Sequence, residues 1–163
     1  MNSTAPRIPV EALLERIRGL VGKDGASADP KDIEPFLTDR TEAPAGRADI
    51  VVRPRTTADV AAVLKLANEL LVPVVPVVAG TNTGGIAIPE RGGIVLDLRR
   101  MDKILEVNER DLYMVVEPGA TFEKVHDHLA ARYPRLRIGY PMSPPESSVL
   151  ANCILDGLGN LSL

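Results

Sequence analysis

A β-branched run that enters a glycine-rich turn is the part of this chain with the clearest chemical use. Residues 74–78 lead into Ala79-Gly80-Thr81-Asn82-Thr83, and Gly84 and Gly85 follow at once. Glycine adopts positive φ and lets a ligand approach the main chain closely. Successive amides in such a turn converge into a concave set of donors that suits a phosphate or pyrophosphate. The loop therefore predicts a nucleotide-cofactor site, although a tight surface turn between two strands would have the same composition.

Two familiar phosphate-binding motifs are absent from this loop. A P-loop requires Lys and then Ser or Thr after its last glycine, whereas Ile86 and Ala87 follow Gly85. The dinucleotide fingerprint G-x-G-x-x-G fails because Gly80 and Gly84 are separated by three residues. The nearest approach, residues 157–162, is followed only by Leu163 and not by the helix that the motif needs. A cofactor at this loop must therefore use a different architecture.

Composition limits the class of protein. A chain of 163 residues, 45% hydrophobic and 25% charged, is long enough for one domain with a core. The net charge of −3 and the scarcity of aromatic residues argue against a nucleic-acid partner. Cys153 alone excludes an internal disulfide and multi-cysteine metal sites. With neither a bilayer-length apolar run nor a signal peptide, we expect a soluble, cytoplasmic protein with no membrane span.

The pattern before the loop predicts helices and one strand. Apolar residues at helical spacing indicate a helix over residues 9–21, and Asp29 with Pro30 predicts the start of a second, short helix. Residues 38–49 are polar and read as a connector. A strand is expected at Ile50–Val52, then a helix that begins at a capping box of Thr56 and Asp59. Its buried stripe is predicted to be Val60, Val63, Leu64, Ala67 and Leu71. With the strand at 74–78, this order predicts a right-handed βαβ unit.

The pattern after the loop predicts three strands and a helix. The strands are expected at residues 93–98, 104–107 and 112–117, with a hairpin turn at residues 108–111. Thr121 is a plausible cap for a helix that buries Phe122, Val125 and Leu129. Residues 141–148 form a stiff, polar turn region, and the apolar residues after it suggest an incomplete fold or a missing partner. The fold class is therefore α+β.

Four elements in order resemble one family. The chain is similar to the N-terminal part of FAD-linked oxidases of the vanillyl-alcohol oxidase and p-cresol methylhydroxylase (PCMH) superfamily, which includes glycolate oxidase and D-lactate dehydrogenase flavin subunits. The resemblance covers residues 49–163, and the elements that carry it are residues 52–60, the glycine loop, residues 93–101 and residues 116–121. It implies a helical extension and connector at 1–48. Residues 49–163 would then be the first lobe and the start of the second lobe of a PCMH-type FAD-binding domain, incomplete at its C-terminal end.

The resemblance also implies where FAD would bind. The cofactor would lie between two α+β lobes, with its pyrophosphate on the main chain of Val78, Ala79, Gly80, Thr81, Asn82 and Thr83, beside Gly84 and Gly85. Pro118 and Gly119 would form part of the cofactor wall. A later set would line the flavin and ADP portions: Pro141, Ser147, Ser148, Asn152, Gly157, Gly159 and Asn160. Asp97 is better explained as a strand or turn residue than as a ligand, and turns or strand ends also explain the nearby carboxylates of Glu117 and Asp156.

Two departures from the family bear on function. Some relatives attach FAD through a histidine near the position of Thr81, and threonine cannot form that bond, so FAD is expected to bind non-covalently at the glycine loop. His126 and His128 lie two apart on a predicted helix, where they fit neither a metal pair nor a flavin link, and we expect exposed positions. The second departure is length, because relatives continue into a substrate domain that carries the groups that orient the substrate and take its proton.

Three functional hypotheses follow. The first is the FAD-binding part of an oxidoreductase that transfers a hydride from a 2-hydroxy acid or a para-substituted phenol to flavin N5, with a complementary domain or second chain. The second is a truncated or non-catalytic flavin-binding or assembly subunit that needs a partner chain. The third, a plain α/β module without cofactor, requires the four matched elements to coincide in order by chance.

Overall fold

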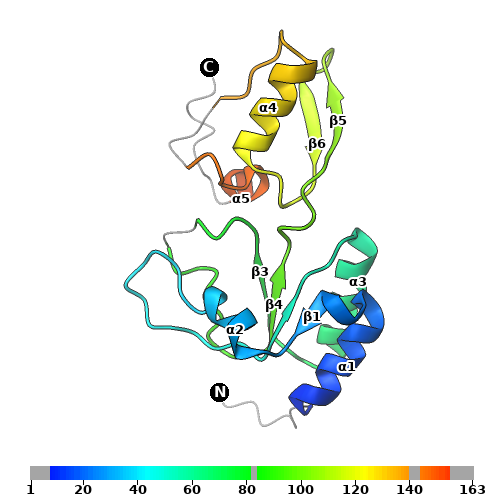
Figure 1. Cartoon of the computed structure of the whole chain (residues 1–163), viewed down its shortest axis with the longest axis vertical. Coiled ribbons are helices and arrows are strands. Elements are labelled where there is room, and N and C mark those ends of the chain that lie inside the picture. The colour runs from blue at the N-terminus through cyan, green and yellow to red at the C-terminus, as the bar shows by residue number, and fades with distance from the viewer. Residues whose placement is uncertain (1–7, 82–83, 140–143, 155–163) are drawn as a thin grey trace. The chain divides into compact units, whose positions relative to one another are not determined.

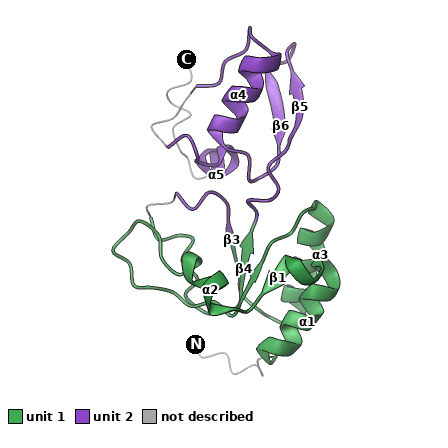
Figure 2. Cartoon of the chain, viewed as in Figure 1, with its two compact units in different colours: residues 1–76, 83–97 green, residues 77–82, 98–163 purple. Residues whose placement is uncertain are grey.

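The computed structural model describes residues 8–81, 84–139 and 144–154. The chain divides into two compact units, which Figure 2 shows in different colours. Unit 1 comprises residues 1–76 and 83–97, and unit 2 comprises residues 77–82 and 98–163. The glycine loop is therefore shared between the units. Residues on both sides of position 48 lie in unit 1, and the domain boundary expected there stays a prediction.

Unit 1 is built on a four-stranded sheet with the order β1-β2-β4-β3 (Figure 1). Its strands are β1 (Ala26–Ser27), β2 (Ile50–Val52), β3 (Val74–Val77) and β4 (Ile94–Asp97). β2 and β4 are parallel, with Ile50 beside Ile94, and β1 runs antiparallel to β2. Every residue of β2 and β4 is buried, as expected for parallel strands that are covered on both faces.

The expected strand–helix–strand unit is present, but its two strands are not neighbours. β4 lies between β2 and β3 in the sheet. The Ile94 amide donates to the Pro73 carbonyl at 2.9 Å, and the Leu98 amide donates to the Val77 carbonyl at 2.8 Å. The offset is the same in both pairs (94 − 73 and 98 − 77), so β3 and β4 advance in the same direction.

Three α-helices complete the described part of unit 1: α1 (Val10–Val21), α2 (Pro30–Ile33) and α3 (Thr57–Glu69), with 3₁₀ turns at 23–25 and 34–36. α1 contacts α3, β1 and β2, and it buries Leu13 and Ile17. Two predicted caps are confirmed. The Asp29 side chain accepts from the Lys31 amide, and Thr56 and Asp59 form a reciprocal capping box at the start of α3.

The predicted apolar stripe of α3 is wrong at two positions. Leu64 and Leu71 are exposed, whereas Leu66 is buried beside Val63 and Ala67. Leu71 lies beyond the end of the helix at Glu69 and has a φ of +52°. Helical periodicity therefore does not apply to Leu71, and its side chain does not continue the buried face of α3.

Unit 2 contains the hairpin of β5 (Ile104–Asn108) and β6 (Tyr113–Val116), followed by α4 (Phe122–Arg132) and α5 (Val149–Ile154). The predicted turn at 108–111 is confirmed, because the Asn108 side chain accepts from the amides of Arg110 and Asp111. The predicted cap of α4 is also confirmed, since Thr121 Oγ1 accepts from the Lys124 amide. Phe122, Val125 and Leu129 are buried as expected. α5 was not predicted as a helix.

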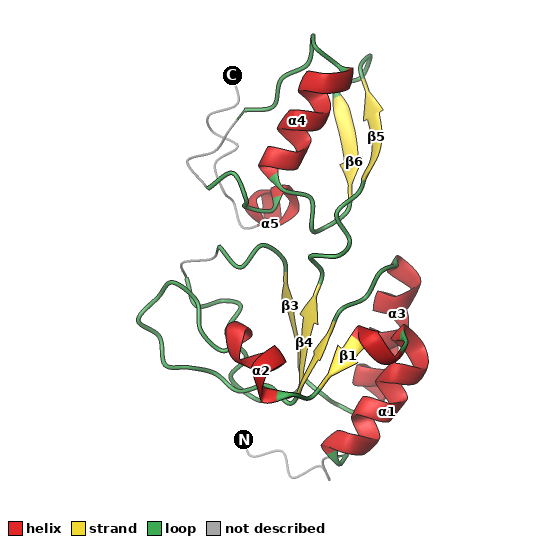
Figure 3. Cartoon of the chain, in the orientation of Figure 1, coloured by secondary structure: helices red, strands yellow, loops and turns green. Residues whose placement is uncertain are grey.

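Helices and strands in both units confirm the α+β class (Figure 3). Across residues 8–81, 84–139 and 144–154, no helix is long and apolar enough to cross a membrane.

Candidate functional site

The part of the glycine loop in unit 2 presents unused main-chain donors. Gly80 has a φ of +68°, and a Cβ placed on it would meet no heavy atom within 4 Å. Within the described residues, the amides of Ala79, Gly80 and Thr81 make no hydrogen bond to another protein group. Main-chain donors beside a glycine with open space around it suit an anionic ligand that comes close to the backbone. This geometry fits the pyrophosphate role predicted for the loop.

Two serines of the predicted later cofactor-lining set are buried in unit 2, and one of them, Ser147, contacts this part of the loop. Thr81 Oγ1 and Ser147 Oγ are 3.1 Å apart, and either hydroxyl can donate. Ser147 is only 5% exposed and Ser148 only 1%. Ser148 Oγ donates to the Pro118 carbonyl at 2.7 Å, and Ser148 forms an antiparallel bridge with Thr121. Unit 2 therefore brings together residues that are far apart in the sequence, as the predicted site requires.

Gly119 has a structural reason to be glycine. A Cβ placed on it would lie 2.8–2.9 Å from the carbonyl oxygens of Leu98, Arg99 and Met101. Its amide donates to the Met101 carbonyl at 2.7 Å. The main chain at this point packs directly on the turn after β4, so close packing explains this glycine without a ligand.

The part of the loop in unit 1 is held by a residue that the sequence assigned to the connector. The Gly85 amide donates to Asp39 Oδ2 at 2.8 Å, across 46 positions of sequence, and Gly85 has a φ of +71°. Asp39 Oδ1 accepts from both the amide and the hydroxyl of Thr41. Gly85 therefore gives its N–H to the protein, in contrast to the amides at residues 79–81.

These contacts lower the pKa of Asp39 below its usual 3.8, chiefly through the Thr41 hydroxyl and further through the amides of Thr41 and Gly85. A carboxyl whose pKa is lower in the folded state contributes stability above its unfolded pKa, and loses it as the pH falls through the folded value. We expect Thr41→Val to raise the pKa of Asp39 towards 3.8, because the hydroxyl donor is lost. A titration of the Asp39 carboxyl carbon by NMR below pH 5 measures it. An unchanged pKa would show that the hydroxyl does not stabilise the carboxylate.

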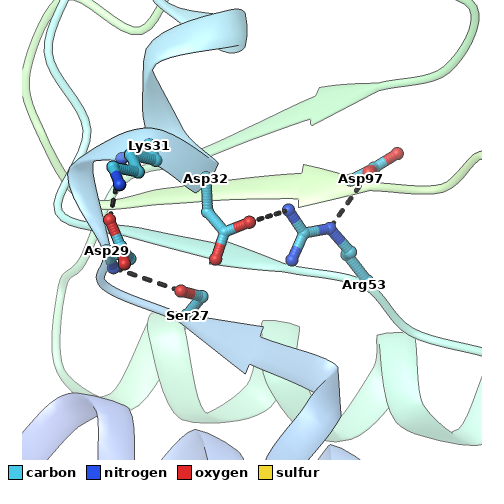
Figure 4. Close-up of polar contacts among 6 residues, drawn as sticks. All are labelled: Ser27, Asp29, Lys31, Asp32, Arg53 and Asp97. Atoms are coloured by element: carbon cyan, nitrogen blue, oxygen red, sulfur yellow. Dashed lines mark hydrogen bonds and ion pairs between the residues drawn. The ribbon is translucent and has the colours of Figure 1, made fainter.

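A charged cluster holds the ends of β2 and β4 in unit 1 (Figure 4). The guanidinium of Arg53 lies 3.1 Å from Asp32 Oδ1 and 3.6 Å from Asp97 Oδ2. Asp97 is the last residue of β4 and is buried. The pKa of Asp32 is lowered by hydrogen bonding to the Ser27 side chain and by Arg53. The structure thus places Asp97 in a strand, in agreement with its interpretation as a strand or turn residue.

Of the remaining predicted residues, some are described by the structure and others are not. Asn152 lies on α5 and its amide donates to the Ser148 carbonyl at 3.1 Å. Glu117 accepts from the Lys103 amide, which gives it a role in the hairpin. The following predicted residues lie outside the described residues: Asn82, Thr83, Pro141, Asp156, Gly157, Gly159 and Asn160.

The two histidines differ in exposure. His126 is exposed, and His128 is half-buried with its ring centroid 5.8 Å from that of Tyr133. Exposure was expected for both, so the position of His128 differs from the prediction because Tyr133 covers it. In the described part of the chain, no group of three or more His, Cys, Asp or Glu side chains could hold a metal ion.

A turn with main-chain donors at the end of a strand, within an α+β fold, is a geometry that suits the phosphate groups of a nucleotide cofactor. The profile of the FAD binding domain family matches residues 48–162, and the chain belongs to that family, the FAD-binding domain of PCMH-type FAD-linked oxidases.

Three similar proteins illustrate the family. The chain is 35% identical over 153 residues to 1′-carboxy-chondrochloren decarboxylase of Chondromyces crocatus, covering 93% of this chain and 28% of that protein. It is 31% identical over 120 residues to the 4-cresol dehydrogenase [hydroxylating] flavoprotein subunit of Pseudomonas putida, covering 71% and 23%. The crystal structure of p-cresol methylhydroxylase with substrate bound superposes with a TM-score of 0.80 at 26% identity, covering 91% of this chain and 30% of that one. The chain thus spans about a quarter of the length of these curated relatives.

Proposed function

We propose that this chain binds FAD non-covalently through the main chain of the glycine loop, as the FAD-binding part of a flavin-dependent oxidoreductase. The observation that carries the proposal is the set of amides at Ala79, Gly80 and Thr81 that make no hydrogen bond within the described residues, beside a glycine with open space around it. Their N–H groups would donate to the diphosphate, and Gly80 would let it approach. Membership of the FAD binding domain family supports the identity of the ligand.

The chemistry at position 81 supports non-covalent binding at the glycine loop. The hydroxyl of Thr81 pairs with the buried hydroxyl of Ser147, and a neutral threonine hydroxyl is a weak nucleophile without an adjacent base. Thr81 would therefore shape the loop without forming a bond to the cofactor.

Bound FAD supplies an acceptor for a hydride from a substrate C–H bond. The substrate class that we propose is a 2-hydroxy acid or a para-substituted phenol. Relatives named D-lactate dehydrogenase and 4-cresol dehydrogenase support these two classes. The residues of this chain would bind and orient the cofactor, whereas the groups that hold the substrate would come from a complementary domain or a second chain.

The alternative is a non-catalytic flavin-binding or assembly subunit that needs a partner chain. Both possibilities include FAD binding and differ in activity. The two possibilities are distinguished by adding a 2-hydroxy acid or a para-substituted phenol to the FAD-bound chain in the absence of oxygen. Loss of flavin absorbance would show that the substrate reduces the flavin, as the oxidoreductase requires.

Binding is tested by adding FAD to the purified chain, removing free FAD by gel filtration and recording the absorption spectrum. We expect flavin absorption to elute with the protein and to be released by acid or heat denaturation, as for a non-covalent cofactor. His126→Ala is the control, since His126 is exposed on α4 and its loss should leave the flavin content unchanged. Elution without flavin at FAD concentrations up to the millimolar range would refute the proposal.

A further inference from the structure

Unit 2 fixes the position of Ser147 through its main chain. The Phe122 amide donates to the Ser147 carbonyl at 3.1 Å, and the Val149 amide donates to the Ala120 carbonyl at 3.0 Å. The Ser147 amide itself donates to the Pro144 carbonyl at 2.9 Å. The segment around Ser147 is therefore attached to the segment where α4 begins, and the Cα of Ser147 has a fixed place in unit 2.

The side chain of Ser147 is buried and is satisfied by the glycine loop. Ser147 is only 5% exposed, and its Oγ lies 3.1 Å from Thr81 Oγ1, across 66 positions of sequence. Among the residues that the structure describes, Thr81 is the only hydrogen-bond partner of this hydroxyl. A buried hydroxyl that loses its partner costs more free energy than the bond itself contributes. The fold therefore favours the loop conformation that keeps the two hydroxyls together.

The loop depends on the same bond. In the described part of the chain, the contact with Ser147 is the only hydrogen bond that residues 79–81 make. Gly80, at a φ of +68°, is not restricted by packing, since a Cβ placed on it would meet no heavy atom within 4 Å. A glycine in such surroundings has many accessible conformations. The Ser147 hydroxyl is therefore the specific contact that selects the observed conformation of residues 79–81.

We propose that Ser147 is a positioning residue for the cofactor, which acts through the hydroxyl of Thr81 to hold the amides of residues 79–81 in the conformation that binds the FAD diphosphate. This inference rests on the proposed FAD binding. Ser147, Thr81 and these amides all belong to unit 2 (Figure 2). Without the bond, FAD must order the loop as it binds, and ordering each backbone residue carries an entropic cost.

The test is a double-mutant cycle in the 163-residue chain, with Ser147→Ala, Thr81→Val and the double variant. Each single change removes one hydroxyl of the pair, so Thr81→Val still tests the bond if Ser147→Ala does not fold. Thr81→Ser keeps a hydroxyl at position 81. Ser27→Ala is the matched control, because Ser27 Oγ also makes a 3.1 Å hydrogen bond, from the Asp29 amide in unit 1.

Two quantities are measured on variants that are folded by circular dichroism. One is the FAD dissociation constant. The other is the NMR order parameter of the Gly80 and Thr81 amides without FAD, which reports backbone motion on the picosecond to nanosecond timescale.

We expect Ser147→Ala to weaken FAD binding by about three- to tenfold, the range for loss of a hydrogen bond between neutral groups. Thr81→Val should lose a similar factor, and the double variant should lose no more than about twofold beyond either single change, because both remove the same bond. Thr81→Ser should lose less affinity than Thr81→Val. The order parameters should fall in Ser147→Ala and stay unchanged in Ser27→Ala, which should also keep the FAD affinity of the parent.

Three results would overturn the inference. The first is an FAD affinity of Ser147→Ala within twofold of the parent, since the bond would then be structural only. The second is a pair of losses that multiply in the double variant, because Ser147 would then act on FAD independently of Thr81. The third is an unchanged order parameter of both loop amides in Ser147→Ala.

The parent chain separates this inference from the proposed function. Failure of the parent to bind FAD removes the proposed function, and the positioning role with it. A parent that binds FAD no more tightly than Ser147→Ala does removes the positioning role alone.

Discussion

Replacing Gly80 with valine is expected to weaken FAD binding by at least about tenfold. Gly80 has a φ of +68° in the part of the loop where three amides make no hydrogen bond to any residue that the structure describes. A β-branched residue held at positive φ is strained by about 1–3 kcal/mol, so valine would shift the loop to another conformation. The donors at residues 79–81 would then no longer converge, and the added side chain would occupy the open space beside them. Flavin absorbance that elutes with the variant, and its FAD dissociation constant, measure the effect.

Gly22→Val controls for backbone strain. Gly22 has a φ of +83°, and a Cβ there also meets no heavy atom within 4 Å, but the residue follows α1 and lies outside the loop. Both variants should lose similar stability in urea, whereas only Gly80→Val should lose flavin. A variant at position 80 that keeps its yellow colour, or equal loss of flavin in both variants, would count against the loop as the diphosphate site.

Contacts between near neighbours in the sequence were predicted well. The capping box of Thr56 and Asp59, the cap at Thr121 and the Asn108 turn each depend on residues at most three positions apart. Such contacts follow from side-chain chemistry and local geometry alone. The boundaries of β2 and the buried residues of α4 were also predicted correctly, because the spacing of apolar residues and the residues that flank each element indicate the same structure.

Contacts between distant segments were missed. Asp39 lies in a polar stretch, and an Asp with a Thr two residues later indicates only a local turn. Nothing in the sequence pairs it with Gly85, because that pairing depends on how two loops meet in the folded unit. β1, with two residues, is too short for an alternation pattern and forms by pairing with β2. The position of β4 between β2 and β3 is a further feature of sheet order that periodicity does not encode.

The candidate site was predicted by resemblance more than by pattern, and the structure adds a reason for several of its members. Thr81 and Ser147 were both predicted to contact FAD, and in unit 2 their hydroxyls contact each other. Ser148 bonds to the Pro118 carbonyl. We infer that these residues shape the surface on which the cofactor would lie, so their effect on binding would be partly indirect.

Replacing Arg53 with methionine is expected to destabilise the protein by about 3 kcal/mol. The guanidinium lies 3.6 Å from Asp97 Oδ2, and the side chain of Asp97 is only 3% exposed. Removing one partner of a buried ion pair costs about 3–5 kcal/mol, because the remaining charge stays desolvated. Asp97 keeps a further interaction, so the expected loss lies at the lower end of this range. Methionine keeps much of the aliphatic stem, and the Arg53 amide can still donate to the Gly25 carbonyl, so the loss reports mainly the charge. Urea unfolding followed by circular dichroism gives the change in the free energy of unfolding.

Asp32→Asn is the matched comparison, since Asp32 contacts the same guanidinium at 3.1 Å from a side chain that is 43% exposed. Solvent screens an exposed ion pair to about 0–1 kcal/mol, so this variant should lose little stability although its partner is closer. The order of the two effects is therefore set by burial and not by distance. Equal losses in Arg53→Met and Asp32→Asn, or a loss below about 1 kcal/mol in Arg53→Met, would show that Arg53 does not compensate the charge of Asp97.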